Sequence, residues 1–303
     1  MSNFLTFTSI FDGSSLNYGE STANITSLKK ISYKGKSYSY ISRQALRYDI
    51  VRIMNEEFNM QMTPVGNDGK VVQFEANAKI DAYPEIDLFG YMKTSGEGTK
   101  GKIRKAIVRL SDAISLESWN NDIDYGNNMG LSARKEGLDN MIFQNEIHRS
   151  FYTYTVTIEL DKVGFDKNDS INLPDKIKEE RVNLLLDSIR LLYRDIKGRR
   201  EDLSPVFTIG GIYNSGNPFF YNKLELSFGK DTVKIKAEPI NEILEREFNN
   251  KKIKNLTYIG YLDGIFSNID DIKNINGDKK GGIDKFFNEL KKCVNKVYLK
   301  GNL

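Results

Sequence analysis

The sequence predicts an α+β fold whose main elements follow the order strand, helix, strand, strand, helix, strand. Two kinds of pattern support this: alternating or β-branched runs are typical of strands, and apolar stripes at intervals of three and four residues are typical of helices. The βαββαβ order is that of ferredoxin-like and RNA-recognition folds. Two polar segments interrupt it, at about 59–102 and 113–150, and we interpret both as insertions into a single domain spanning 1–303.

The first strand and helix lie near the N-terminus. FLTFTSIF (Phe4–Phe11) alternates as a strand does, and Asp12-Gly13 ends it. A lysine-rich loop with an expected turn at Lys34-Gly35 follows, and Ser42 is the expected N-cap of the helix. The apolar stripe of that helix consists of Leu46, Ile50, Ile53, Met54 and Phe58.

The remaining core elements are of unequal clarity. Lys102–Leu116 (KIRKAIVRLSDAISL) suits a helix by its spacing and a strand by its β-branched residues. Phe151–Leu160 (FYTYTVTIEL) is the clearest strand. An amphipathic helix is predicted from Pro174 to Ile196, stopped by Gly198.

The C-terminal part is predicted to add a few further elements. We expect strands at Pro205–Tyr213 and Pro218–Phe228, a short helix after Pro239 and a last helix at Ile283–Val297.

Composition places the chain among globular proteins. It has 303 residues, of which 39% are hydrophobic and 28% charged. No segment approaches the roughly 18 apolar residues that a membrane-spanning helix needs. The N-terminus lacks a basic signal-peptide region, and the single cysteine excludes an internal disulfide and a cysteine-based metal site. These features predict a cytoplasmic protein with no membrane partner.

The net charge of +3 is unevenly distributed. Asn17–Tyr48 and Met92–Arg109 each carry six cations and one acid, so each has a net charge of +5 and the rest of the chain is acidic. Two basic segments in an acidic protein indicate a local site for a polyanion. Tyrosines accompany them and favour nucleic acid, since tyrosines stack on unpaired bases. They are Tyr18, Tyr33, Tyr38, Tyr40, Tyr48 and Tyr91.

The sequence contains little that indicates a catalytic or cofactor site. The only histidine, His148, has no nucleophile signature near it, and no metal or cofactor is expected. Gly96–Gly101 (GEGTKG) matches the spacing of a dinucleotide-binding loop, which leaves a nucleotide-cofactor enzyme as an alternative. That motif needs a strand before it and a helix after it. A lysine-lined glycine loop explains the same residues more simply.

The order of several segments resembles a known family. The segments are FTSIFDGSSLNYGE, YISRQALRYDIVRIM, DLFGYM, FYTYTVTIELDKVGF and PVFTIGGIYNSGNPFF, which cover most of residues 4 to 228. Together they resemble the Cst/DevR branch of the Cas-seven family, the backbone subunits of type I CRISPR Cascade complexes, and most resemble type I-B. The resemblance implies an RRM-like palm, a finger or web at about 59–102 and a thumb at about 113–150. It also implies that Lys102–Leu116 is a strand.

The same resemblance implies a function and a set of partners. Several copies would line up head to tail along a CRISPR RNA, together with other Cascade subunits, and would present the guide to a target DNA strand. Arg43 and Arg47 would hold phosphates beside a helix N-terminus. Met129 and Arg134 would act from the thumb. The candidate RNA-binding residues are Asn17, Ser42, Arg43, Gln44, Arg47, Lys100, Lys102, Arg104, Met129 and Arg134.

No catalytic residue is expected. A related type III backbone subunit cuts RNA with an aspartate in the loop between the first strand and the first helix. Here 17–42 contains no aspartate, and Glu20 is its only acid. A non-catalytic scaffold is therefore expected. A stand-alone RNA-binding regulator remains the second alternative to the backbone subunit.

Overall fold

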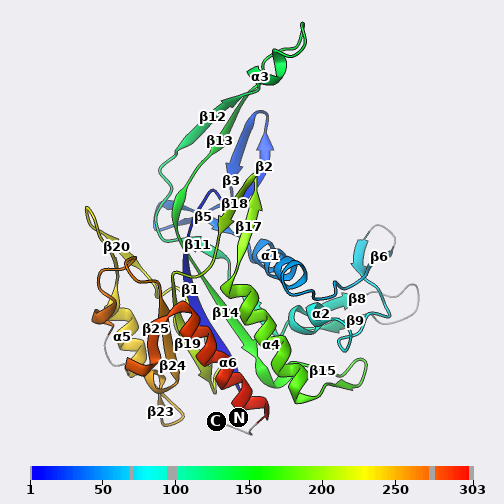
Figure 1. Ribbon diagram of the computed structural model, residues 1–303, viewed down its shortest axis with the longest axis vertical. Helices are drawn as coiled ribbons and strands as arrows, with labels where there is room; N and C mark the ends of the chain where they lie inside the picture. The colour runs from blue at the N-terminus through cyan, green and yellow to red at the C-terminus, as the bar shows by residue number, and fades with distance from the viewer. Residues whose placement is uncertain (1, 69–70, 94–100, 273–276, 300–303) are drawn as a thin grey trace.

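The structure is a computed structural model that describes residues 2–68, 71–93, 101–272 and 277–299. Within these residues, a nine-stranded sheet forms the centre of the molecule (Figure 1). Its strands lie in the order β25-β24-β19-β1-β14-β11-β5-β4, and β10 also pairs with β14. Their bounds are β1 Phe4–Ser14, β4 Lys30–Tyr33, β5 Lys36–Ile41, β10 Val108–Leu110, β11 Ala113–Ser115, β14 Arg149–Glu159, β19 Phe207–Tyr213, β24 Thr257–Tyr261 and β25 Lys280–Gly282.

Strand β1 is the centre of the sheet. It pairs antiparallel with β14 along its whole length and with β19 along Phe4–Ile10. Helix α1 (Arg43–Glu56) follows β1 along the chain, and α4 (Asp175–Arg190) joins β14 to β19. With β10 and β11 before β14, the chain follows the strand, helix, strand, strand, helix, strand order expected from the sequence.

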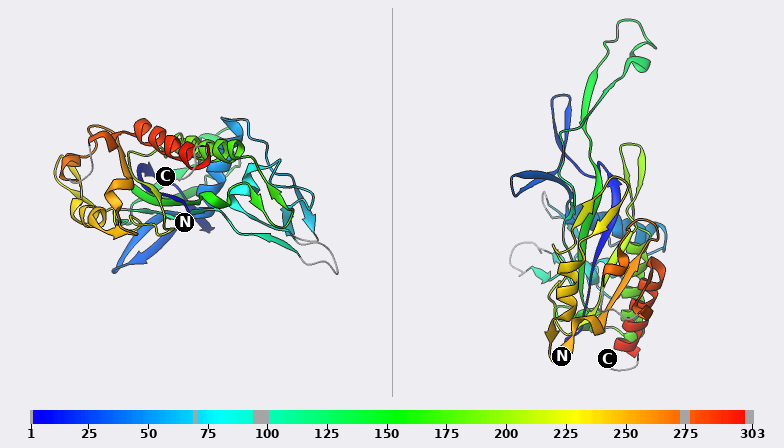
Figure 2. Two further views of the ribbon diagram at one scale, coloured as in Figure 1. Left: turned by 90° about the horizontal axis from the view of Figure 1, so that it is seen from below. Right: turned by 90° about the vertical axis from the view of Figure 1, so that its left-hand side faces the viewer.

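Three helices cover one face of this sheet (Figure 2). They are α1, α4 and the last helix, α6 (Ile283–Leu299). Phe7 on β1 meets Phe286 and Phe287 of α6 edge-on, with ring centroids 6.0 and 5.9 Å apart. The expected last helix is confirmed, and it completes the main core.

The other face is covered by the chain that follows β19. Successive residues of a strand point to opposite faces, so Phe7 packs toward the helices and Ile10 packs into a second core. Helix α5 (Ala237–Glu245) contributes Ile240 to that second core. The C-terminal third is thus part of both cores.

Several local predictions were wrong. Lys102–Leu116 forms three short strands, because β9 (Lys102–Arg104) pairs outside the main sheet and Ser111-Asp112 separates β10 from β11. Helix α4 ends at Arg190, and a hairpin with left-handed backbone at Lys197 and Gly198 follows it. Gly198 therefore marks a hairpin turn, where two consecutive positive φ angles favour glycine.

The last part of the chain also departs from expectation. Within Pro218–Phe228 only β20 (Leu226–Phe228) is a strand, and it pairs with β21 (Val233–Ile235). Helix α5 begins at Ala237, two residues before Pro239. Proline is accepted there because the first turn of a helix has no internal partner for its N–H groups.

The two polar segments form separate structures beside the sheet (Figure 1). The first contains the hairpin β6–β7, helix α2 and the hairpin β8–β9, and we call it the lateral insertion (59–104). The second contains β12 and β13 with α3 at its tip, and it extends far from the central sheet; we call it the long projection (120–147). Hairpin β2–β3 adds to it, giving a four-stranded sheet in the order β12-β13-β3-β2.

The remaining elements are short. Their bounds are β2 Tyr18–Thr22, β3 Ile25–Leu28, β6 Val65–Asp68, β7 Val71–Phe74, α2 Pro84–Phe89, β8 Tyr91–Lys93, β12 Ile123–Asn127, α3 Met129–Ser132, β13 Ile142–Glu146, β15 Phe165–Asp166, β16 Ile171–Asn172, β17 Tyr193–Ile196, β18 Arg199–Asp202, β22 Glu247–Phe248 and β23 Lys251–Lys252. Among the described residues, no helix combines the length and the apolar character needed to cross a bilayer.

Candidate nucleic-acid interface

The start of helix α1 is built as the sequence predicts. Ser42 is extended, and its side-chain oxygen accepts the backbone N–H of Ala45 at 3.4 Å, which is the geometry of an N-cap. Behind it, the Asn17 amide donates to the Ser42 hydroxyl at 3.5 Å. Asn17 is only 7% exposed, so it supports the cap and does not itself offer a surface to RNA.

Arg43 and Gln44 are exposed at this helix start. Among the contacts of the described residues, none involves the Arg43 guanidinium. Its backbone N–H, however, donates to the Asp112 carboxylate at 2.7 Å. An internal carboxylate thus already occupies part of the helix N-terminus, which sequence reasoning had treated as an open anion site. An anion here would have to be held mainly by the Arg43 side chain.

Arg47, one turn further on, is engaged inside the protein. Its guanidinium lies 3.5 Å from Glu85 of the lateral insertion and 5.1 Å from the Phe89 ring. Burial lowers the pKa of Arg47, and the neighbouring Glu85 carboxylate opposes that effect. Arginine stays charged under any ordinary condition. Arg47 therefore differs from Arg43, although the sequence presents them as equivalent.

The basic residues of the second charged segment are also largely paired. Lys102 forms an ion pair with Asp169. The Arg104 guanidinium is 7% exposed, pairs with Asp87 at 2.5 Å and donates to the Phe165 carbonyl. Arg104 is therefore engaged within the protein, and its role as an RNA contact stays a prediction. Lys100 lies outside the described residues.

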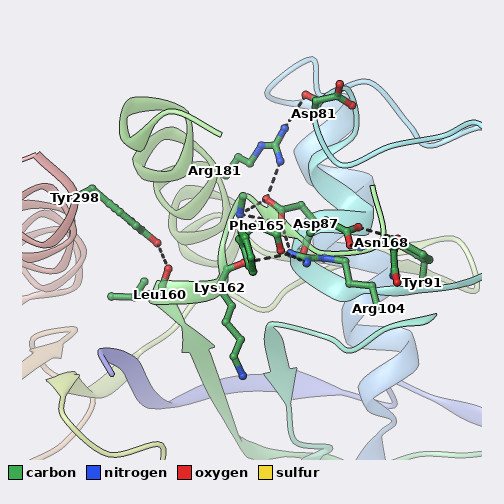
Figure 3. Close-up of polar contacts among 12 residues, drawn as sticks. Asp81, Asp87, Tyr91, Arg104, Leu160, Lys162, Phe165, Asn168, Arg181 and Tyr298 are labelled. Carbon is green, nitrogen blue, oxygen red and sulfur yellow. Dashed lines mark hydrogen bonds and ion pairs between the residues drawn. The ribbon is translucent and has the colours of Figure 1, made fainter. Parts of the chain in front are cut away.

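A buried charged cluster fastens the lateral insertion to helix α4 (Figure 3). The fully buried Asp87 carboxylate binds Arg104 on one side and Arg181 of α4, at 2.7 Å, on another. Both carboxylate oxygens also accept the Gly164 N–H at 3.0 Å. These contacts join three parts of the chain that are distant in sequence, and no local sequence pattern predicts them.

The predicted residues of the long projection lie at its tip. Met129 begins the one-turn helix α3 and is 59% exposed, and Arg134 just beyond it is also exposed. Figure 1 shows this tip well away from α1. Met129 and Arg134 therefore do not share one surface with Arg43 in a single copy.

The base of the long projection is held by buried polar contacts. The Ser39 hydroxyl bonds both His148 Nδ1 and the Tyr152 hydroxyl, each at 2.7 Å. Burial lowers the pKa of His148, with Asp122 opposing, and raises the pKa of Tyr152 to about 12. His148 is thus a buried neutral residue that helps to orient the projection.

Lys30 belongs to the same anchor. Its ammonium pairs with Glu146 at 2.6 Å and lies 3.5 Å from the centre of the Trp119 ring. The Trp119 indole N–H donates to the Ile147 carbonyl at 3.0 Å. One cation of the first basic segment therefore holds the projection in place and is not available to a polyanion.

Sequence reasoning missed a second group of cations beside α1. Lys197, at the turn of hairpin β17–β18, lies 4.1 Å from the Tyr18 ring, and Arg199 donates to the Ser14 carbonyl at 3.2 Å. Tyr18 follows Asn17, whose amide contacts Ser42 at the helix start, so Lys197 lies on the same side of the molecule as Arg43. We call Arg43, Gln44, Tyr18, Lys197 and Arg199 the basic strip. The run IKGRR at 196–200 was the signal, hidden by its assignment to a helix end.

The nucleotide-cofactor alternative receives no geometric support from the described residues. Part of Gly96–Gly101 lies outside them, but strand β9 follows it and pairs antiparallel with β8. A dinucleotide loop would be followed by a helix, so the nucleotide-cofactor reading is wrong. No group of three or more metal-binding side chains was found among the described residues.

The fold is shared with chains of solved CRISPR complexes. Two solved structures are similar over 96% of this chain: a chain of a "CRISPR RNA-guided surveillance complex" (TM-score 0.61, 10% identity, 99% of that chain) and one of a "CRISPR RNA-guided surveillance complex, pre-nicking" (TM-score 0.63, 9% identity, 100% of that chain). At these identities the likeness concerns the fold alone.

The sequence comparisons give the family. The family model described as "CRISPR-associated negative auto-regulator DevR/Csa2" matches residues 5–223, and the chain belongs to this family. The "CRISPR-associated protein Cas7/Cst2/DevR" of Myxococcus xanthus (strain DK1622) is 30% identical over 157 residues, which are 47% of this chain and 52% of that protein. The chain therefore spans about half the length of this curated relative. The expected Cas-seven, Cst/DevR membership is confirmed.

Proposed function

We propose that this chain is a non-catalytic CRISPR RNA-binding backbone subunit of a type I Cascade surveillance complex, of subtype I-B, acting in the cytoplasm. Family membership and the fold shared with chains of surveillance complexes support the proposal. In it, the central sheet with α1 and α4 is an RRM-like palm within one domain. The lateral insertion is the web, and the long projection is the thumb.

The observation that carries the RNA-binding part is the basic strip. Its Arg43 guanidinium is exposed beside a capped helix start, and Lys197 continues the positive charge toward the thumb. Arg199 beside it is half-exposed and shares its charge with Glu201 at 3.6 Å. Arginine and lysine bind phosphates without regard to base sequence. Tyr18 adds an aromatic face beside Lys197. A guide strand that follows this strip would be held chiefly by its backbone.

Assembly is the second part of the proposal. Copies contact one another head to tail along the guide, with the thumb of one copy reaching toward the next. Such a heterologous contact forms open filaments where the rotation does not close. Other Cascade subunits end the filament, and a target DNA strand pairs with the guide that it presents.

The scaffold role without cleavage rests on the loop between β1 and α1. This loop contains no aspartate, and its only acid, Glu20, is exposed on β2. One observation favours a different role, since the matching family is described as a negative auto-regulator. A stand-alone RNA-binding regulator therefore remains the second candidate.

Co-purified nucleic acid tests the proposal. The backbone role predicts bound RNA of defined length that contains CRISPR repeat sequence, and native mass spectrometry on guides of increasing length should show copy number rising in whole-number steps. Deleting 120–135 from the thumb should leave a folded protein that binds RNA weakly and without steps. Heterogeneous RNA with one stoichiometry at every length would support the regulator instead.

A further inference from the structure

A cleft that borders the basic strip at Arg199 has a volume of about 830 Å³ and is lined by more carboxylates than arginines. It lies between the end of β1, the end of α4, strand β18 and the start of α6. Its lining includes four carboxylates and two arginines, and exposed leucines form part of its surface. The carboxylates are Asp12, Glu201, Asp202 and Asp284.

The charges of this cleft are only partly balanced from within. Asp12 is held by Arg149 at 2.8 Å, and Asp284 by Arg190 at 2.9 Å. Glu201 accepts the Ser14 N–H at 3.1 Å and lies 3.6 Å from the Arg199 guanidinium. No arginine or lysine pairs with Asp202 among the contacts of the described residues. Asp202 is therefore the carboxylate of this cleft that a cationic partner would neutralise.

Apolar surface inside the same cleft requires that the partner also be apolar. Leu191 is 47% exposed and Leu262 is 51% exposed, and both line the cleft together with Pro205 and Val206. Large aliphatic side chains left in water beside a cavity of this size are typical of a site that another molecule covers. The occupant should therefore combine lysine or arginine with an aromatic or aliphatic side chain.

This chain carries a segment of that composition. At the tip of hairpin β4–β5, residues 31–36 are all exposed, and the tip has two lysines and no acid. Ile31 is 47% exposed, and Tyr33 is 61% exposed with the Lys34 ammonium 5.1 Å from its ring. Figure 2 shows the blue hairpin projecting from the side of the sheet away from α4 and α6. Glu225, which lies near Lys34, is paired with Lys236 at 2.7 Å.

The other projecting tip fits less well. The tip of the long projection has apolar side chains, but Arg134 and Lys135 there are balanced by Glu136 and Asp139. The tip of the long projection therefore offers no net positive charge to the cleft, whereas the β4–β5 tip carries two lysines and no acid.

The hairpin cannot reach the cleft of its own chain. In the sheet order β1-β14-β11-β5-β4, the hairpin lies four strands from β1, which is about 19 Å at the usual strand spacing. A contact between the two must therefore join different copies. Because the two surfaces differ, it leaves one hairpin and one cleft free and can be repeated.

We propose that the β4–β5 tip of one copy docks in the acidic cleft of the next, with Tyr33 against Leu191 and Leu262 and Lys36 facing Asp202. The inference rests on the head-to-tail assembly proposed above and names its contact surfaces. It requires no RNA at the contact. The contact itself can therefore be tested on RNA-free protein.

Two complementary variants give the test. Tyr33→Ala with Lys36→Glu changes only the hairpin, and Leu262→Ser with Asp202→Asn changes only the cleft; all four side chains are exposed, so the midpoint of thermal unfolding should not move. In sedimentation velocity without RNA at low salt, wild-type protein should associate as concentration rises. Each variant alone should associate about tenfold more weakly. Lys167→Glu, on an exposed loop elsewhere, should behave as wild type.

Mixing the two variants is the decisive measurement. Each retains the surface that the other has lost, so an equimolar mixture should form heterodimers that cannot extend further. Failure of the mixture to dimerise, or unchanged association of either variant, would overturn the docking contact. So would a hairpin variant that loses RNA affinity while associating normally, since the tip would then contact nucleic acid. Stepwise assembly on guides that persists in these variants would leave the proposed function standing while the docking inference fails.

Discussion

The two arginines of helix α1 should respond differently to the same substitution. Arg43 and Arg47 lie one turn apart, but the Arg43 side chain is exposed and the Arg47 guanidinium lies 3.5 Å from Glu85. Binding of a phosphate releases condensed counterions, so each lost contact lowers the slope of log affinity against log salt by about 0.7 for single-stranded RNA. Arg43→Ala should therefore reduce the slope by about 0.7. Arg47→Ala should barely change it.

The size of the effect follows from the salt range. Between roughly 50 and 200 mM salt, one phosphate contact of this kind accounts for about a 2.5-fold difference in affinity. Fluorescence anisotropy with a labelled single-stranded RNA over this range resolves such a change. Lys167→Ala, an exposed lysine far from the basic strip, is the matched control and should leave the slope unaltered.

Stability should separate the two arginines in the opposite sense. Arg43 makes no side-chain contact within the described residues, so Arg43→Ala should leave the free energy of unfolding within about 0.5 kcal/mol. Arg47→Ala removes a half-exposed ion pair and the contact with the Phe89 ring, a loss of about 1 kcal/mol. Equal salt slopes for the two variants, or a slope unchanged by Arg43→Ala, would refute the assignment of phosphate binding to Arg43.

Three further outcomes follow from the structure. Asp87→Asn leaves two buried arginines without their carboxylate and should cost about 3–5 kcal/mol of unfolding free energy in urea titrations. Asp195→Asn, in an exposed pair, should barely change the unfolding free energy, and equal costs would contradict the anchoring role. Burial lowers the pKa of His148 in the folded state, so its contribution to the free energy of unfolding should be complete above about pH 6.5 and should decline as the pH falls below that value. His148→Gln should flatten this decline in melting curves recorded at different pH values. The protein should not cut RNA or DNA with Mg²⁺ or Mn²⁺ in gel assays, and cleavage abolished by Glu20→Gln would show that the scaffold assignment is wrong.

Local sequence patterns predicted the elements whose packing follows from periodicity. Helix α1 buries its apolar stripe as the pattern requires, and strands β1 and β14 form where alternating and β-branched residues predicted strands, although β1 is buried on both faces. Helix α4 was placed correctly at its start but extended too far. Leu192 and Ile196 continued the helical spacing, while the Lys197-Gly198 turn that actually reverses the chain was assigned to a helix end.

The candidate site was less predictable because ion pairing is set by distant parts of the chain. Arg47 forms an ion pair with Glu85, 38 positions further along the chain, and Asp87 pairs with both Arg104 and Arg181. No local pattern distinguishes such a paired arginine from an exposed one. Composition located the two insertions and the family resemblance named them, but neither could show which cations were already paired within the protein.

The distribution of unpaired cations carries more functional information than the charge of the segments that contain them. In the first basic segment, Lys30 pairs with Glu146 and Arg47 with Glu85, so their charge stabilises the fold and attracts little from solution. The exposed cations that remain point in two directions: Arg43 lies at the start of α1, and Lys36 lies on the β4–β5 hairpin, across the β5 strand from that helix. One segment of sequence therefore serves two surfaces. A polyanion on the basic strip and an acidic cleft on a neighbouring copy can be bound at the same time, because the two cationic groups do not compete for one ligand. A guide that holds two copies side by side would raise the effective concentration of the hairpin for the neighbouring cleft, so guide binding and contact between copies would strengthen each other.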